Sequence, residues 1–330
     1  MEMLYQRDVY GQTLAELGRQ DSNIIVLDAD LSGSTRTCLF AKEHKERFFN
    51  FGVAEQHMMA AAAGFASCGK IVFVSTFAIF ATGRAWDQVR NTVAYNNFNI
   101  KIVATHAGVT VGPDGASHQA LEDITLMRIV PNVKLIVPAD APQTRDAVLA
   151  AYKTPGPVYV RLGRPKVPTI LGKGHFKLGA AEILSKGNDL TIIACGIMVK
   201  QALDAAVSLK KEGVSCRVIN MHTIKPIDTQ AIVQAARETK GIVVCEEHTV
   251  VGGLASAVDE VAAENYPAAV LRVGVKNRYG QSGESDELIN EYELSVKDII
   301  RTCKKILSFG QKHIISYAIK KIASRTDDKS

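Results

Sequence analysis

The feature that most constrains the fold of this chain is an alternation of short apolar runs with segments of helical periodicity. Runs typical of strands cover residues 23–28, 71–75, 99–105, 133–137 and 158–161. Segments with the apolar spacing of helices cover residues 7–19, 85–95 and 141–152. Buried strands separated by helices form a parallel sheet that is covered on both faces, so we expect an α/β fold.

A change in composition divides the chain into two parts. Proline and glycine become frequent after residue 163, and the alternation resumes near residue 190, with strand-like runs at 190–195, 215–220, 241–246 and 269–273. We therefore expect two parallel-sheet α/β domains, over residues 1–165 and 189–306, joined by a linker over 166–188. Residues 307–330 form a basic, amphipathic tail, which we expect to be a helix on the surface; docking to a partner or to a membrane surface is the alternative.

Composition excludes several classes of protein. Hydrophobic residues make up 47% of the 330 positions and the net charge is only +5, which is ordinary for a globular protein. No basic run with interleaved aromatic residues indicates nucleic-acid binding, and no apolar run approaches the ~20 residues that cross a bilayer. The six cysteines contain no C-x-x-C pair, which favours buried thiols in a reducing compartment. We therefore expect a cytoplasmic protein.

Polar and aromatic residues follow the predicted strands of the first domain. Ligands of open parallel sheets gather at the carboxyl ends of the strands. The residues found there are Asp28, Asp30, Ser32 and Ser34, then Thr76, Phe77 and Phe80, then His106, and finally Arg161 and Arg164.

The stretch NFGVAEQHMMAAAAGFAS, residues 50–67, indicates a short polar approach followed by a helix with one acid, Glu55, in its first turn. An acid in the first turn complements the helix dipole, which is the simplest interpretation. A second stretch, THAGVTVGPDGASHQ over residues 105–119, is rich in glycine and presents His106, Asp114 and His118. Two histidines and an aspartate in one loop favour a functional site, although the spacing is not that of a metal centre.

Five motifs occur in an order that resembles a known family. They are DADLSGST, FGVAEQH, STFAIF, THAGVTVGPDGASHQ and VRLGRP. In this order they resemble the C-terminal section of transketolase, in the form in which that enzyme is split into two chains. The resemblance runs from Arg7 to about Lys305, and it implies a pyrimidine-binding domain followed by a transketolase C-terminal domain.

The resemblance implies chemistry carried out by thiamine diphosphate. Glu55 matches the glutamate that bonds the aminopyrimidine ring of this cofactor and helps to activate it, which requires a setting shielded from water. Phe80 matches the residue that stacks on the pyrimidine, with Phe77 beside it. Asp30 matches a residue at the contact between cofactor and subunits.

The resemblance also implies a binding site for sugar phosphates. Positions that match residues binding the acceptor phosphate are Arg7, Ser34 and Arg164, and guanidinium groups suit that anion. His106 and Asp114 match residues that contact substrate hydroxyls. His118 matches a histidine near the reacting carbon, where it is a candidate for proton transfer. The family pattern is broken at Pro113 and Gly83, where an acid and a tyrosine are common.

The family binds the diphosphate and Mg²⁺ through a G-D-G…N motif that this sequence does not contain. We therefore expect the Mg²⁺ ligands on an N-terminal transketolase subunit, an α2β2 assembly with the cofactor at the interface, and no activity from this chain alone. The expected reaction transfers a two-carbon ketol unit from a ketose phosphate to an aldose phosphate, in the pentose phosphate pathway or in a route that uses another sugar.

Three alternatives remain open from the sequence. The β subunit of a 2-oxo-acid dehydrogenase shares the pair of domains and the glutamate. A deoxyxylulose-phosphate-synthase-like enzyme shares the GPDGASHQ stretch. A regulatory subunit with a vestigial site is the non-enzyme alternative, although a scaffold has no need of Glu55 or the loop histidines.

Overall fold

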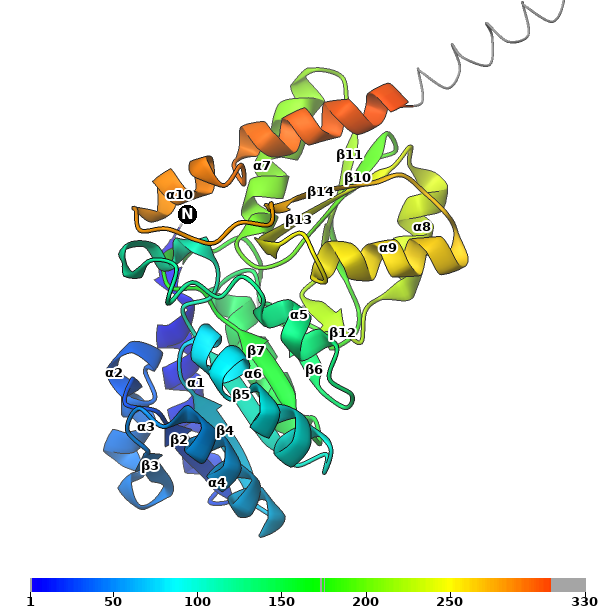
Figure 1. The fold of residues 1–330 in the computed structure, drawn as a ribbon. Helices are drawn as coiled ribbons and strands as arrows, with labels where there is room; N and C mark the ends of the chain where they lie inside the picture. The colour runs from blue at the N-terminus through cyan, green and yellow to red at the C-terminus, as the bar shows by residue number, and fades with distance from the viewer. Residues whose placement is uncertain (1, 173, 175, 310–330) are drawn as a thin grey trace, which may run out of the picture.

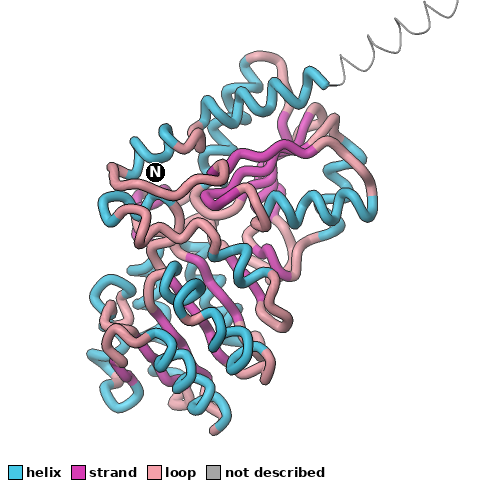
Figure 2. Tube along the Cα trace, viewed as in Figure 1, coloured by secondary structure: helices cyan, strands magenta, loops and turns pink. Residues whose placement is uncertain are grey.

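The computed structural model describes residues 2–172, 174 and 176–309, and it contains two α/β domains (Figure 1). The two large sheets have seven and five strands, and a two-stranded sheet lies beside them. The strands of each large sheet lie between helices, as the alternation in the sequence predicts (Figure 2).

The first domain is built on the seven-stranded sheet, in the order β12-β6-β7-β5-β4-β2-β3. All neighbouring pairs are parallel except β12 with β6. Residues of the central strands are buried because helices cover both faces. The strands are β2 (Ile24–Asp28), β3 (Phe48–Asn50), β4 (Ile71–Ser75), β5 (Ile100–Ala104), β6 (Lys134–Ile136), β7 (Val158–Arg161) and β12 (Thr223–Lys225).

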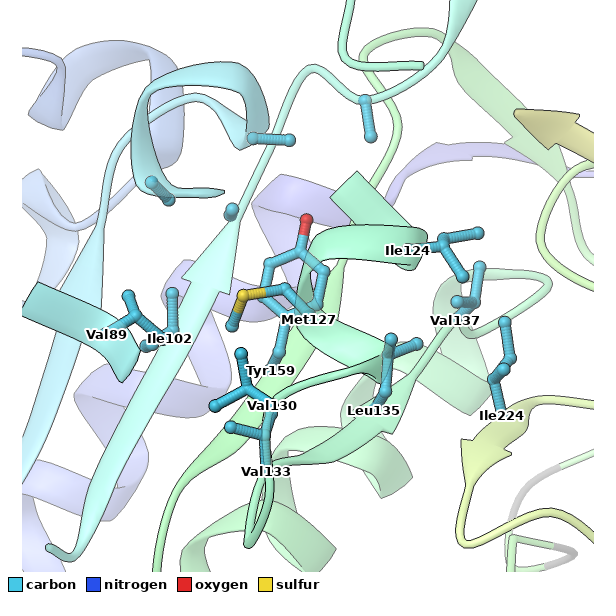
Figure 3. Packing of buried hydrophobic residues seen from close by; sticks show 14 of the residues in the cluster. Val89, Ile102, Ile124, Met127, Val130, Val133, Leu135, Val137, Tyr159 and Ile224 are labelled. Atoms are coloured by element: carbon cyan, nitrogen blue, oxygen red, sulfur yellow. The ribbon is translucent and has the colours of Figure 1, made fainter. Parts of the chain in front are cut away.

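The helices of the first domain divide between the two faces of its sheet. Tyr10, Leu14 and Phe40 pack on one face, whereas Met58 and Val89 pack on the other. Figure 3 shows side chains from several elements meeting in the second of these cores, including Ile224 of β12. The helices are α1 (Gln6–Gln20), α2 (Ser32–Thr35), α3 (Cys38–Glu43), α4 (Glu55–Ser67), α5 (Asp123–Arg128) and α6 (Ala141–Lys153).

The second domain has the order β14-β13-β10-β11-β9, with β9 antiparallel to the rest. A helix over residues 296–309 and α7 cover one face, and α8 and α9 cover the other (Figure 1). The strands are β9 (Glu182–Ser185), β10 (Leu190–Ala194), β11 (Cys216–Asn220), β13 (Ile242–Thr249) and β14 (Val270–Val275). The helices are α7 (Met198–Lys211), α8 (Thr229–Glu238), α9 (Leu254–Asn265) and α10 (Ser285–Glu291).

The expected linker is more ordered than its composition indicates. Residues 166–188 contain β8 (Lys166–Pro168), which pairs antiparallel with β1 (Met3–Tyr5), and β9, which extends the second sheet. In addition, β12 follows β11 in the chain but joins the edge of the first sheet. One strand of the second half of the chain, β12, therefore forms the edge of the first sheet, and neither large sheet is wholly parallel.

One helical prediction is confirmed with a different hydrogen-bond pattern, and another falls mostly outside the description. The segment expected as a helix over residues 85–95 is helical from residue 86 to residue 94, but with a π-helical turn at Gln88–Ala94 that follows another at Phe80–Arg84. A π-helical turn accommodates an extra residue in a helix and is frequent at functional sites. The tail expected as a surface helix, 307–330, lies outside the described residues beyond position 309. In the part of the chain that is described, no helix is long and apolar enough to cross a bilayer.

We predict that Asp140→Ala destabilises the fold by about 3 kcal/mol, because three backbone N–H groups lose their acceptor. Asp140 is fully buried, and its oxygens accept from Gln143 at the start of α6 (3.0 Å) and from Ile170 (2.9 Å) and Leu171 (2.7 Å) in the segment between the domains. Chemical denaturation measures the change. Asp146→Ala, which removes one exposed bond to Gly174, is the control; an equal loss in both variants would contradict this account.

Candidate active site

The carboxyl ends of neighbouring strands bring the predicted residues to one edge of the first sheet. Phe77 follows β4 and His106 follows β5, and a bridge between Phe77 and Thr105 prolongs the pairing of these strands. Arg164 follows β7. The edge anticipated from the strand order therefore exists, and most of the candidate residues lie along it.

Glu55 is the first residue of α4 and only 2% of it is exposed. Its Oε1 accepts a hydrogen bond from Nη1 of Arg84 at 2.7 Å. Its Oε2 is buried and has no hydrogen-bond partner. A buried carboxyl oxygen without a donor is unfavourable, so a ligand that donates a hydrogen bond to this atom would be stabilised.

An aromatic shelf lies next to the glutamate. Phe77 stacks on His106 with ring centroids 3.8 Å apart, and it lies nearly parallel to Phe80 at 6.0 Å. Phe80 meets His118 edge-on at 5.3 Å, and the guanidinium of Arg84 lies 4.6 Å above its ring. Arg84 therefore links Glu55 to a group of rings that includes both loop histidines.

His106 has a constrained backbone and a neutral side chain. Its φ is +61°, and its Nδ1 shares a hydrogen bond of 2.8 Å with the hydroxyl of Thr105. Burial, followed by the nearby positive charges of Arg7 and Arg164, lowers the pKa of His106 to about 3. The imidazole is therefore uncharged near neutral pH, and its ring can accept or donate one hydrogen bond to a polar ligand.

Arginine side chains converge beside His106. Arg7 donates to the carbonyl oxygen of Ser34 at 3.4 Å, while its Nε is buried without a partner. Burial and the neighbouring Arg36 lower the pKa of Arg7. Arg164 donates to the carbonyl of Val111 in the glycine-rich loop. An anion beside these positive charges would offset their mutual repulsion and could accept from the unused donor.

The remaining candidates lie at the rim of this site. Asp114 lies 3.8 Å from Arg164 in a weak ion pair. Asp30 is exposed with a φ of +64°, and it exchanges two hydrogen bonds with the side chain of Asn50. The described contacts therefore place Asp30 beside the approach to α4 and not within the aromatic shelf.

Sequence reasoning missed Arg84 and Arg36. Arg84 lies four positions after Phe80, and the π-helical turn at Phe80–Arg84 brings it back over that ring. A helical period of 3.6 gives only a rough signal of this proximity, and nothing in the sequence shows that Arg84 reaches Glu55. Arg36 belongs to none of the sequence motifs, and its positive charge lowers the pKa of Arg7.

Among the described residues, no group of three or more histidine, cysteine, aspartate or glutamate side chains could hold a metal ion. The side chains that could hold an organic cofactor are instead Glu55, through its unused oxygen, and the rings of Phe77 and Phe80.

Comparison with known proteins decides the family. Residues 2–169 match the family model described as the pyrimidine binding domain of transketolase, and residues 179–299 match the model for its C-terminal domain. This chain belongs to the transketolase family. A putative transketolase C-terminal section from Methanocaldococcus jannaschii is 49% identical, over 89% of this chain and 94% of that protein.

Other transketolase subunits of similar length are also alike. A 6-deoxy-6-sulfo-D-fructose transketolase subunit from Clostridium is 38% identical over 93% of this chain and 95% of its own length. One subunit of an apulose-4-phosphate transketolase from Phocaeicola vulgatus is 40% identical over 94% of this chain and 99% of its own length. A solved structure described as a split gene transketolase, inactive beta4 tetramer, is 47% identical with a TM-score of 0.85, covering 93% of this chain and 99% of its own. The chain thus corresponds to the β subunit of a split transketolase.

We predict that His106 makes the fold sensitive to acid. Because its pKa is lowered to about 3 from 6.5, it stabilises the folded state above pH 6.5, and this contribution is lost as the pH falls from 6.5 toward 3. Between pH 7.5 and pH 5 the loss is about 2 kcal/mol. His106→Asn, which tolerates the positive φ, removes this part of the loss in urea denaturation. His57→Asn, on the exposed face of α4, is the control and keeps the wild-type response; equal responses of both variants would contradict the assignment.

Proposed function

We propose that this chain is the C-terminal subunit of a transketolase that depends on thiamine diphosphate and transfers a two-carbon ketol unit from a ketose phosphate to an aldose phosphate. The observation that carries the proposal is the buried Oε2 of Glu55, which has no partner and lies at the start of α4 beside the aromatic shelf. The membership of the transketolase family supports the same conclusion.

The described residues fit this cofactor. Glu55 Oε2 would accept a hydrogen bond from the aminopyrimidine ring, and Phe77 and Phe80 would pack against it. When bound, thiamine diphosphate supplies a nucleophilic carbon that holds the electron pair of the cleaved carbon–carbon bond. Arg84, which bonds Glu55 and covers Phe80, would share the glutamate with the cofactor or move aside.

The two loop histidines would handle the sugar hydroxyls. His118 is placed by its edge-on contact with Phe80 and by a hydrogen bond between its Nδ1 and Ser117 at 2.9 Å, which leaves Nε2 for a substrate hydroxyl and its proton. His106 would act as an uncharged hydrogen-bonding partner because its pKa is low. Asp114 would accept from a hydroxyl farther along the sugar.

Arg7, Arg164 and the turn at Ser34 would bind the anionic end of the sugar. The charges of both arginines act on His106, so the anion would lie beside the reacting end of the loop. The named substrates of two similar subunits carry a sulfo group or a phosphate, and both are anions that a guanidinium can bind. We propose an anionic sugar as the substrate and do not restrict it to the pentose phosphate pathway.

We also propose that activity requires an N-terminal-type subunit that holds Mg²⁺ and the diphosphate, in an α2β2 assembly. One face of α4 and the loop before it are exposed, including Val53 at 75%, so Glu55 lies next to a surface that a partner could cover. The similar split-gene chain, whose structure is a beta4 tetramer, is described as inactive.

We predict that the isolated chain is inactive and that the complex with its partner transfers ketol units from xylulose 5-phosphate to ribose 5-phosphate. Glu55→Ala should lower kcat in that complex by at least ~10²-fold, because the activating carboxyl is lost, while size-exclusion chromatography shows unchanged assembly. The matched control is Glu16→Ala. Glu16 lies on α1 and pairs with Arg145 of α6 at 2.6 Å.

Two results would defeat the proposed function. One is a wild-type rate from the Glu55→Ala complex, and the other is turnover of pyruvate in place of the two sugar phosphates. The pyruvate arm separates ketol transfer from the chemistry of 2-oxo-acid dehydrogenases and deoxyxylulose-phosphate synthases.

We predict that Arg7→Gln weakens recognition of the anionic group specifically. The KM for ribose 5-phosphate should rise by about 10-fold or more because a charged hydrogen-bond donor is lost, whereas the KM for an unphosphorylated aldehyde should change little. Arg19→Gln, on an exposed part of the same helix and paired with Glu43, is the control. An equal rise in KM for ribose 5-phosphate and for the unphosphorylated aldehyde would show that Arg7 does not bind the anionic group.

A further inference from the structure

The glycine-rich loop is held by groups outside it as well as by its own hydrogen bonds. Gly108, Gly112 and Gly115 have φ values of +84°, +81° and +73°, a backbone conformation that favours glycine. A short 3-10 helix, Val109–Asp114, is interrupted by the non-helical Gly112. Because this loop carries the candidate substrate residues Asp114 and His118, groups outside it have to define its position.

Most of these outside groups belong to the second domain. Ser285 donates its hydroxyl to the carbonyl of Thr110 at 3.0 Å. The side-chain amide of Gln119 donates to the carbonyl of Gln281 at 2.9 Å. In Figure 1 the loop lies next to α10 and the segment that precedes it. The second domain therefore forms the wall against which the loop folds.

The central contact of this wall is a carboxyl group. Glu247 on β13 is 4% exposed, and its Oε1 accepts the backbone N–H of Thr110 at 2.7 Å. A Cβ atom on Gly108 would lie 2.2 to 2.4 Å from the atoms of this carboxyl, so only glycine lets the loop approach it. Arg161 donates to the carbonyl oxygen of Glu247 at 2.9 Å and fixes the strand at this point.

We infer that Glu247 is a positioning residue for the reaction: the reach of its side-chain oxygen to the Thr110 N–H, and not its charge, sets the loop that carries Asp114 and His118. This inference rests on the proposed function for its kinetic consequence alone. Burial raises the pKa of Glu247 to about 6, against the opposing effects of Arg161 and the Thr110 hydrogen bond, so the pocket disfavours the charged form relative to water. The second domain would then act on substrate binding from outside the site.

The test compares Glu247→Asp, which keeps the charge and shortens the reach, with Glu247→Gln, which keeps the reach and removes the charge. Hydrogen exchange of the full-length chain reports the loop directly. We expect the aspartate variant to accelerate exchange of the amides in residues 108–119 by about 10-fold or more, and the glutamine variant to stay near the wild type. In the complex with the partner subunit, the same pattern is expected in the KM for the sugar phosphates.

Glu246→Asp is the matched control. Glu246 is the neighbouring buried acid on β13, but its oxygens accept from Leu254 and Ala255 at the start of α9, so shortening it should loosen α9 and leave the loop unchanged. The inference is overturned if exchange in the loop accelerates in both Glu247 variants, in neither variant, or in the glutamine variant alone. Hydrogen exchange is measured without substrate, so it does not depend on the proposed reaction. If the wild-type complex lacks transketolase activity, the proposed function fails, but the exchange result for the Glu247 variants still stands.

Discussion

A buried ion pair at the seam between the domains supports both the fold and the site. Nε of Arg161 at the end of β7 bonds Oδ2 of Asp123 at 2.7 Å, and the side chains are only 6% and 0% exposed. The hydroxyl of Tyr159 donates to the same oxygen at 2.7 Å. Arg161 also reaches the carbonyl oxygens of Ala120 and Glu247. Desolvation makes a buried pair costly, and its value lies in the geometry it imposes when each donor is used.

The candidate active site is assembled from several elements of the first domain and from the loop between the domains. The first sheet brings Phe77, His106 and Arg164 to one edge, and α4 adds Glu55 from the side. The loop over residues 108–119 crosses above them, held between Arg164 of its own domain and the wall of the second domain. A carboxyl group with one oxygen that lacks a donor, a ring surface and neighbouring guanidinium groups are thereby gathered in one place.

Prediction from the sequence was accurate where local pattern determines structure. The strands expected at 71–75 and 158–161 have those bounds, and helices α1 and α6 differ by no more than one residue at either end. It was less accurate for β8, β9 and β12, because short edge strands have weak patterns and are stabilised by pairing with distant segments. The helix expected over 85–95 is present, but its π-helical turn was not foreseen, since such a turn changes the period on which the prediction depends.

The sequence by itself determined the alternation of buried strands and helices, the start of a helix at Glu55 and the glycine-rich loop, because burial and backbone preference act over a few residues. Only the tertiary structure decided that Arg84 covers Phe80 and bonds Glu55, and that Glu247 meets Thr110 from 137 positions away. Such contacts depend on how two domains pack, and no local pattern encodes a hydrogen bond between segments that are adjacent only in space.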